Sequence, residues 1–189
     1  RAAIRSPRTL AMAALTAGII SVNWLIYVWA ISSGRAVETA LGYYINPLVS
    51  VLLGALVLGE RLSRAQMVAV GLAALAVTVL TVDAGGLPWV SLTLAISFAA
   101  YGFFKKTLPI GPSQGFFLEV AILCLPALAY LAWLQARGVA HFLPGGGHWF
   151  DFGMLLFAGP VTAVPLILYA FGAKLLRVST IGIMQYVAP

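Results

Sequence analysis

Hydrophobic residues occur along this chain in long uninterrupted stretches, without the alternation of a half-buried strand or the one-sided stripe of a surface helix. Six stretches are separated by short polar connections, and a seventh begins near Ser179. They cover residues 10–31, 39–58, 66–82, 89–104, 114–134 and 152–173. Because about 20 apolar residues cross a bilayer as a helix, the pattern predicts an all-α integral membrane bundle. A transmembrane β-barrel would need shorter, alternating segments.

The composition supports the membrane assignment and excludes other classes. Of the 189 residues, 62% are hydrophobic and 8% are charged, against roughly 45–50% and 25% in soluble domains. So few charges cannot cover a soluble globule, which excludes a cytosolic enzyme and a disordered tail. The single cysteine, Cys124, excludes an internal disulfide. The net charge of +6 is then explained by loop cations, and we expect no nucleic-acid partner.

The cations fall unevenly between the two sides of the predicted bundle. Only Arg35 and Arg137 occur in the connections that follow the first, third and fifth stretches. The other nine are Arg1, Arg5, Arg8, Arg61, Arg64, Lys105, Lys106, Lys174 and Arg177. Cytoplasmic loops are enriched in Lys and Arg, so we expect the N-terminal arginine cluster to be cytoplasmic.

The sequence also resembles itself. An offset of 142 residues aligns 16–47 with 158–189 without a gap, and Arg35 with Arg177 is one of five identities. The first and sixth stretches are five spans apart, so equivalent helices would cross the membrane in opposite directions. Inverted repeats of this kind are typical of secondary transporters.

The repeat predicts how the chain is organised. Residues 1–82 would be the last three spans of a first five-helix repeat. Residues 83–189 would be a truncated second repeat, with three spans and the start of a fourth. We therefore expect ten helices in the full protein, of which about seven are present here, and a chain truncated at both ends.

Polar residues within the spans are candidates for a cavity because each is costly in lipid. In the second stretch Thr39, Tyr43, Asn46 and Ser50 share one helical face. Two interpretations stay open for this face, hydrogen bonding between helices or a polar wall of a solute cavity. The neighbouring Pro47 removes a backbone donor and favours the cavity.

Other spans supply further candidates. In the sixth stretch Pro160 and Pro165 predict a kinked or broken helix around Thr162. Gln185 aligns with Tyr43 in the repeat, and would face the same cavity from the other half. The predicted lining residues are Asn23, Tyr27, Tyr43, Asn46, Thr162 and Gln185, with helix breaks at Pro47, Pro160 and Pro165.

Two acidic residues have alternative interpretations. Glu119 is the only acid well inside a span. It is either a proton-coupling group whose pKa is raised by burial or a partner of Lys105 or Lys106. Glu60 and Arg61 follow the second stretch, where they would form an interfacial ion pair or a cap.

Catalytic and metal-binding patterns are missing from the sequence. His141 and His148 lie in a glycine-rich connection without metal-ligand spacing. No paired carboxylates, Ser/His arrangement or phosphate-binding loop occurs in the spans. We therefore expect no catalytic residues, metal or cofactor, and no primary pumping by ATP.

Several motifs together resemble one known family. They are Leu41–Leu48, Leu58–Leu62, Ser97–Gly102, Ser113–Glu119, Gly159–Leu166 and Ser179–Pro189. In combination they resemble the RarD-type branch of the EamA family, in the drug/metabolite transporter superfamily. The resemblance implies a ten-helix permease of the bacterial inner membrane with two inverted five-helix repeats. Members of this branch are often labelled chloramphenicol-sensitive proteins or predicted permeases, and their superfamily moves amino acids, nucleotide sugars, drugs and other metabolites.

The function hypothesis is a secondary transporter of a small organic solute that works by alternating access and is driven by protons. Its partners would be the solute and the lipid bilayer, with the oligomeric state, including a homodimer, left open. A non-transporting membrane scaffold or sensor is one alternative, and would bury the polar face against a neighbouring helix with no cavity. A membrane-embedded enzyme is the other, and would cluster titratable groups at one depth.

Overall fold

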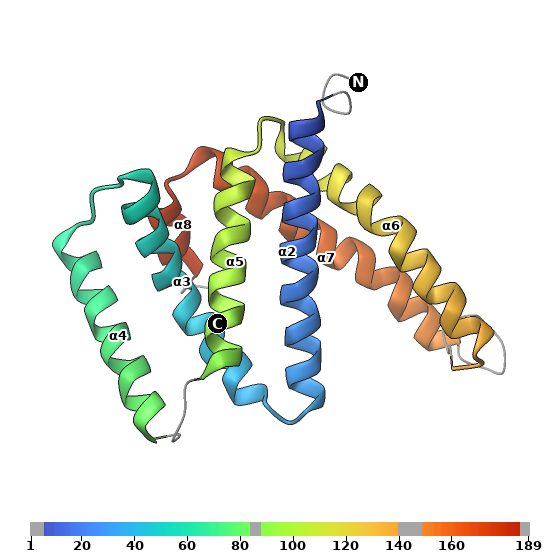
Figure 1. Ribbon diagram of the computed structural model, residues 1–189, viewed down its shortest axis with the longest axis horizontal. Helices are drawn as coiled ribbons and strands as arrows, with labels where there is room; N and C mark the ends of the chain where they lie inside the picture. The colour runs from blue at the N-terminus through green and yellow to red at the C-terminus, as the bar shows by residue number, and fades with distance from the viewer. Residues whose placement is uncertain (1–5, 84–87, 140–148, 186–189) are drawn as a thin grey trace. The chain divides into compact units, whose positions relative to one another are not determined.

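The computed structural model describes residues 6–83, 88–139 and 149–185, and its regular structure in these ranges is entirely helical (Figure 1). The helices are α2 (Pro7–Ser32), α3 (Ala36–Leu58), α4 (Arg64–Asp83), α5 (Trp89–Thr107), α6 (Pro112–Ala136), α7 (Trp149–Leu175) and α8 (Val178–Met184). Each predicted stretch forms a helix, and most helices extend a few residues beyond the apolar run that predicted them. The all-α prediction is confirmed for the described residues.

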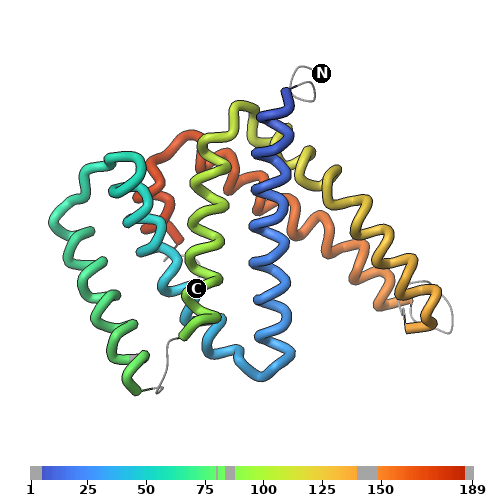
Figure 2. Tube along the Cα trace, viewed as in Figure 1, coloured from blue at the N-terminus to red at the C-terminus, as the bar shows by residue number. Residues whose placement is uncertain are grey.

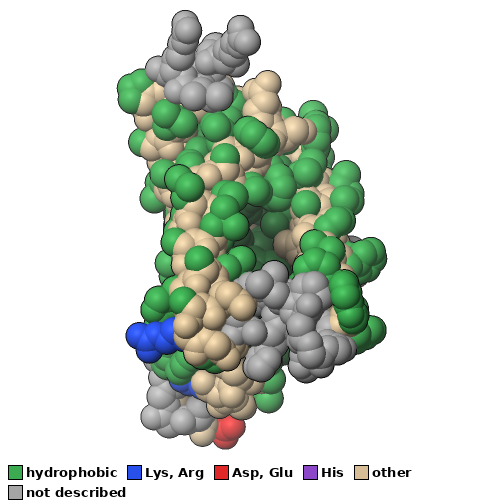
Figure 3. Space-filling model, turned by 90° about the vertical axis from the view of Figure 1, so that its right-hand side faces the viewer, with side chains coloured by type: hydrophobic (Ala, Val, Ile, Leu, Met, Phe, Trp, Pro, Cys, Tyr) green, Lys and Arg blue, Asp and Glu red, His purple; other side chains and the backbone are tan. Residues whose placement is uncertain are grey.

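Five of the helices are long and apolar enough to cross a membrane, namely α2, α3, α4, α6 and α7. The fourth predicted stretch, residues 89–104, forms α5, which does not belong to those five. Its sequence includes Ser91, Thr93 and Ser97, which lower its hydropathy. Large apolar side chains are exposed on most of the helices, and Figure 3 shows a face on which they dominate. The chain is a multi-span membrane helix bundle.

The chain divides into two compact units. The first consists of residues 1–17 and 109–171, and the second of residues 18–108 and 172–189. These units reflect packing and do not follow the boundary expected near residue 82. The division into repeats at that residue stays a prediction.

In the second unit, α3 packs against both α5 and α8 (Figures 1 and 2). Glycines permit these contacts. A Cβ atom on Gly42 would lie 3.1 Å from the Ser91 carbonyl oxygen, and one on Gly182 would lie 2.7 Å from the Pro47 carbonyl oxygen. Small residues let membrane helices approach closely, so these two positions set the spacing of α3 from its neighbours.

The prolines do not interrupt their helices. Pro47 lies inside a continuous α3, and Pro160 and Pro165 lie inside a continuous α7. The helical backbone as described is thus continuous at these positions, and a kink around Thr162, the other outcome that the sequence predicted, stays a prediction. A proline removes one backbone donor, and a long helix can continue through that position because its other hydrogen bonds remain.

The starts of α3 and α8 match the self-alignment. Arg35 is the N-cap of α3, and Arg177 is the N-cap of α8. These two arginines are paired by the offset of 142 residues, 177 minus 35. The two arginines thus take the same position at the start of their helices, and the duplication stays a prediction.

The first unit contains most of α6 and α7. Pro112 opens α6, and the Gln114 side chain accepts a weak hydrogen bond from the Gly111 N–H at 3.4 Å. Proline suits this first turn because its missing N–H would be unsatisfied there anyway. Two turns into the helix, Glu119 is only 3% exposed. A carboxyl group thus lies buried in a helix of membrane-spanning character.

Candidate functional site

A pocket in the second unit lies among α2, α3 and α5. It is partly open, and its enclosed volume is about 20 Å³. Its lining residues are Asn23, Tyr27, Thr39, Gly42, Tyr43, Asn46, Leu94 and Phe98. Polar groups are therefore placed inside an otherwise apolar bundle.

Asn23 joins α2 to α5. Its Nδ2 donates hydrogen bonds to the Leu94 carbonyl oxygen at 3.0 Å and to Ser97 Oγ at 2.8 Å. The Ser97 hydroxyl in turn donates to the Thr93 carbonyl oxygen at 2.6 Å. The Asn23 amide nitrogen is thus committed to packing between helices, although the residue also lines the pocket.

Aromatic rings form another part of the wall. The rings of Tyr27 and Tyr43 meet edge to face, with centroids 6.0 Å apart and an interplanar angle of 74°. Tyr43 is 56% exposed, unlike the buried Thr39 and Asn46 on the same face of α3. Tyr43 therefore lines the pocket while most of its side chain remains exposed.

Asn46 is the most unusual polar group of the pocket. It is 6% exposed, and its Nδ2 donates a hydrogen bond of 2.8 Å to Gln185 Oε1, just after α8. Within the described part of the chain, Asn46 Oδ1 and Gln185 Nε2 are buried without a hydrogen-bond partner. Buried polar atoms are usually satisfied, so these two need an explanation.

The six predicted lining residues are not all brought together. Asn23, Tyr27, Tyr43 and Asn46 line the pocket; Gln185 is not a lining residue but is hydrogen-bonded to Asn46. Thr162 is half-buried in α7 of the first unit, where Glu119 also lies. The assignment of these residues to a solute cavity remains a prediction.

Sequence reasoning missed Gly42, Leu94 and Phe98 as lining residues. Gly42 could have been found, because it lies three residues after Thr39 and four before Asn46, on the same helical face. Leu94 and Phe98 gave no such signal, since an apolar residue of α5 reveals its neighbour only in the folded chain.

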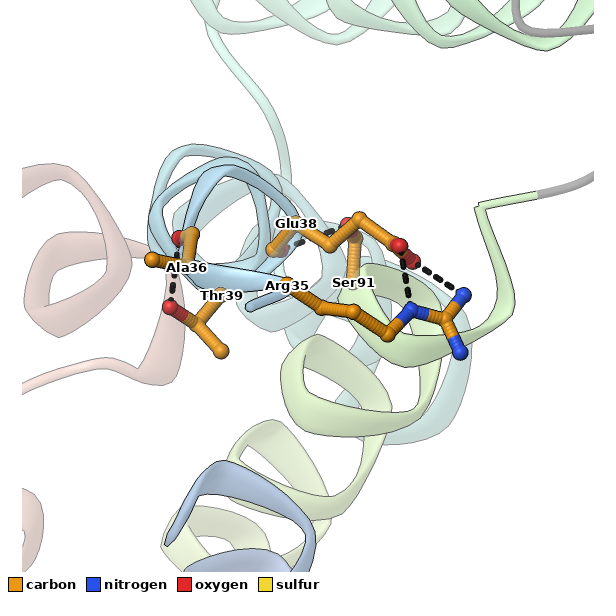
Figure 4. Close-up of polar contacts among 5 residues, drawn as sticks. All are labelled: Arg35, Ala36, Glu38, Thr39 and Ser91. Carbon is orange, nitrogen blue, oxygen red and sulfur yellow. Dashed lines mark hydrogen bonds and ion pairs between the residues drawn. The ribbon is translucent and has the colours of Figure 1, made fainter. Parts of the chain in front are cut away.

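The start of α3, beside the pocket, is fixed by several polar contacts (Figure 4). Arg35 Nε donates to Glu38 Oε1 at 2.6 Å, and its Nη2 donates to Oε2 at 3.0 Å. Ser91 Oγ donates to the Glu38 carbonyl oxygen at 2.6 Å. The Arg35 guanidinium also lies 5.0 Å from the ring centroid of Trp89 and 5.6 Å from that of Trp29. A bidentate ion pair and two aromatic rings thus fix the start of α3.

Glu60 caps the start of α8. The sequence predicted either a cap or an interfacial ion pair with Arg61 after the second stretch. Its Oε1 accepts from the Val178 N–H at 3.0 Å, and its Oε2 accepts from the Ser179 N–H at 3.1 Å. Burial raises the Glu60 pKa, but the hydrogen bonds from Ser179 and Val178 and the charge of Lys106 outweigh it, so the net pKa is lowered. The ionised carboxylate is thus the form this contact favours.

The described residues include no group of three or more His, Cys, Asp or Glu side chains that could hold a metal ion. His141 and His148 lie outside the residues that the structure describes. The histidine interpretation is therefore not addressed by the structure.

A family model matches residues 2–82, and its description is the EamA-like transporter family. Relatives extend the similarity over the whole chain, at 50% identity to Protein RarD of Streptomyces exfoliatus, covering 100% of this chain and 59% of the relative. The chain belongs to the EamA family. An uncharacterized transporter of Bacillus subtilis, YojE, is 45% identical over 90% of this EamA-family chain and 56% of the relative.

An uncharacterized transporter of Vibrio cholerae is 38% identical to the EamA-family chain, over 98% of the chain and 61% of the relative. The chain thus spans about three-fifths of the length of the curated relatives it matches. No solved structure matches it. The match of the EamA model to residues 2–82 covers α2, α3 and α4, which carry four of the six predicted lining residues.

Proposed function

We propose that the complete protein is a secondary transporter of a small organic solute in the bacterial inner membrane. The pocket among α2, α3 and α5 is then part of its solute-binding site. The observation that carries this proposal is the buried, unpaired Oδ1 of Asn46 on the pocket wall. Leaving such an acceptor unsatisfied is costly, and a bound solute that donates a hydrogen bond would remove the cost.

The transporter names of relatives agree with this proposal. The pocket also favours it over a scaffold, because a scaffold would pack the polar face of α3 fully against its neighbours. On that face Ser50 does pack closely against Gly182 of α8, but Thr39 and Asn46 border the pocket. We assign no catalytic role to any residue.

Alternating access would follow from two inverted repeats that move against each other. In that arrangement α3 and α8 are equivalent helices of the two repeats, and they meet at Asn46 and Gln185. A change in their contact would alter the pocket wall directly.

Proton coupling is assigned to Glu119. The support for this assignment is the position of the carboxyl group, which is 3% exposed within a membrane-spanning helix, where ionisable residues are rare and mark proton relays. A switch between charged and neutral forms would then link solute movement to the proton gradient.

The test is transport by the full-length protein in liposomes, with a panel of metabolites, amino acids and drugs and an imposed pH gradient. We expect gradient-dependent flux of at least one solute, lost in Asn46→Leu and uncoupled from the gradient in Glu119→Gln. Gln135→Met, which changes an exposed amide of α6, is the control and should keep normal flux. A complete panel without flux from folded protein would refute transport. Flux that ignores both the gradient and Glu119→Gln would refute coupling alone.

A further inference from the structure

Asn46 and Gln185 form an amide pair that is only half satisfied. One hydrogen bond joins them at 2.8 Å, and one acceptor and one donor remain buried without partners. We propose that this pair recognises a neutral solute that presents a donor and an acceptor side by side, as a carboxamide does. This inference rests on the proposed function and names the substrate class of the same site.

The inference does not depend on which way the two side-chain amides are turned. Oxygen and nitrogen of an amide are assigned from the hydrogen bonds around them. If both amides were turned over, Gln185 would donate to Asn46, and Asn46 Nδ2 and Gln185 Oε1 would be left over. In either arrangement the pair offers one donor and one acceptor, which complements a carboxamide.

Two other polar groups of the pocket are already engaged. The Thr39 hydroxyl donates to the Ala36 carbonyl oxygen at 2.7 Å, and Asn23 Nδ2 is held by Leu94 and Ser97. The unsatisfied atoms therefore single out Asn46 and Gln185 as the recognition element.

The lining residues favour a neutral solute over an ionic one. Among the described residues that line the pocket, none is Lys, Arg, Asp, Glu or His. A buried carboxylate or ammonium needs an opposite charge or several hydrogen bonds, and this wall supplies neither. A neutral amide needs only the pairing that Asn46 and Gln185 leave open.

The remaining wall indicates what the rest of the solute is like. Tyr27, Tyr43, Leu94 and Phe98 present apolar and aromatic surface beside Asn46. Aromatic rings favour edge-to-face or offset contact with another ring. We therefore expect an amide attached to an aromatic or apolar group.

The probes that test this are benzamide, acetophenone and benzoate. They have nearly the same shape, but acetophenone lacks the donor and benzoate is charged. Binding to the full-length protein in lipid nanodiscs is measured by titration calorimetry, with empty nanodiscs as the blank. We expect benzamide to bind at least about tenfold more tightly than either analogue, because a site built around a hydrogen bond rejects a ligand that cannot make it.

The decisive variant is Asn46→Leu/Gln185→Met, which replaces both partners by apolar side chains. Removal of both members of a hydrogen bond can leave stability nearly unchanged, so the variant should fold. It should bind the three probes within about twofold of one another. Gln135→Met makes the same glutamine substitution at an exposed site and should keep the benzamide preference.

Equal binding of the three probes by the wild type, or a preference that survives the double variant, would overturn the inference. Flux of other solutes in liposomes together with equal binding would leave transport standing and remove only the amide class. Selective benzamide binding without flux of any solute would refute the transporter and keep the recognition element.

Discussion

Glu60 holds Ser179 through two hydrogen bonds, one from the Ser179 N–H at 3.1 Å and one from its Oγ at 2.6 Å, both to Oε2. The contact joins the end of α3 to the first turn of α8. Gly54 makes room for it, because a Cβ atom there would lie 2.8 Å from the same oxygen. The chain also turns sharply beforehand, since Gly59 has φ 65° and the Glu60 N–H bonds the Gly54 carbonyl oxygen at 3.0 Å.

We expect Glu60→Gln to lower the thermal stability of the full-length protein in detergent, in a pH-dependent way. The folded pKa of Glu60 is lowered from 4.5, so its stabilising contribution is complete above that value and is lost as pH falls through the folded pKa. The difference in Tm between wild type and Glu60→Gln should therefore be largest near neutral pH and should shrink below pH 4.5. Scanning fluorimetry over this range checks it.

Asp83→Asn is the charge-matched control, because Asp83 is exposed at the end of α4. It should leave the wild-type pH profile in place. A Glu60→Gln protein whose Tm differs from the wild type by the same amount at every pH would show that the carboxylate charge does not stabilise α8.

Gly182→Ala should push α8 away from α3. Its Cβ atom would lie 2.7 Å from the Pro47 carbonyl oxygen and 3.0 Å from Ser50 Cβ. Relief of this contact would require the backbone of α3 or α8 to move, which costs more than a change of side-chain rotamer. We expect a loss of about 1–3 kcal/mol of stability, as for other overpacked cores. Equilibrium unfolding in mixed micelles measures it.

Gly71→Ala makes the same change on α4, where nothing lies within 4 Å of the added atom. Alanine favours helix over glycine by up to about 1 kcal/mol, so this variant should be neutral or stabilised. Equal stability of the two alanine variants would mean that α3 and α8 are not closely packed in the membrane.

The sequence predicted the helices well because long apolar runs report local structure directly. It also placed Asn23 with Tyr27, and Tyr43 with Asn46, on one face of their own helix, since the two residues of each pair are about one helical turn apart. The sequence was less informative where distant segments meet. Nothing in the local pattern around Glu60 indicates that its partner is Ser179, more than a hundred residues later.

The sequence was limited in other places for physical reasons as well. Pro160 and Pro165 suggested a break, but each removes a single donor from a helix of 27 residues. The half-satisfied pair of Asn46 and Gln185 could not be foreseen either. Hydrogen-bond satisfaction depends on the three-dimensional neighbours of each amide, which the repeat alignment does not supply.

Asn23 and Ser97 should be coupled in stability. We expect Asn23→Leu and Ser97→Ala each to destabilise the protein, because both break the bond of 2.8 Å between α2 and α5. Interhelical hydrogen bonds in membranes contribute about 0.6 kcal/mol on average and up to about 1.7 kcal/mol. A double-mutant cycle on unfolding free energy should give a coupling energy in this range, and a value of zero would contradict the predicted role in packing.

The uneven distribution of Lys and Arg predicts which ends of α2, α3 and α4 face the cytoplasm. The connection from α2 to α3 carries only Arg35, whereas the connection from α3 to α4 and its flank carry Arg61 and Arg64. Ser33 and Ser63 are exposed in these two connections, so each can be changed to cysteine for labelling.

The labelling experiment uses full-length protein in intact cells, in a background where the exposed Cys124 is replaced by alanine. A membrane-impermeant maleimide should label Ser33→Cys before the cells are opened and Ser63→Cys only afterwards. The physical reason is that cationic loops are retained on the cytoplasmic side, so the cation-rich end of α3 lies inside. The reverse labelling order would place the N-terminal arginine cluster outside and would contradict the prediction.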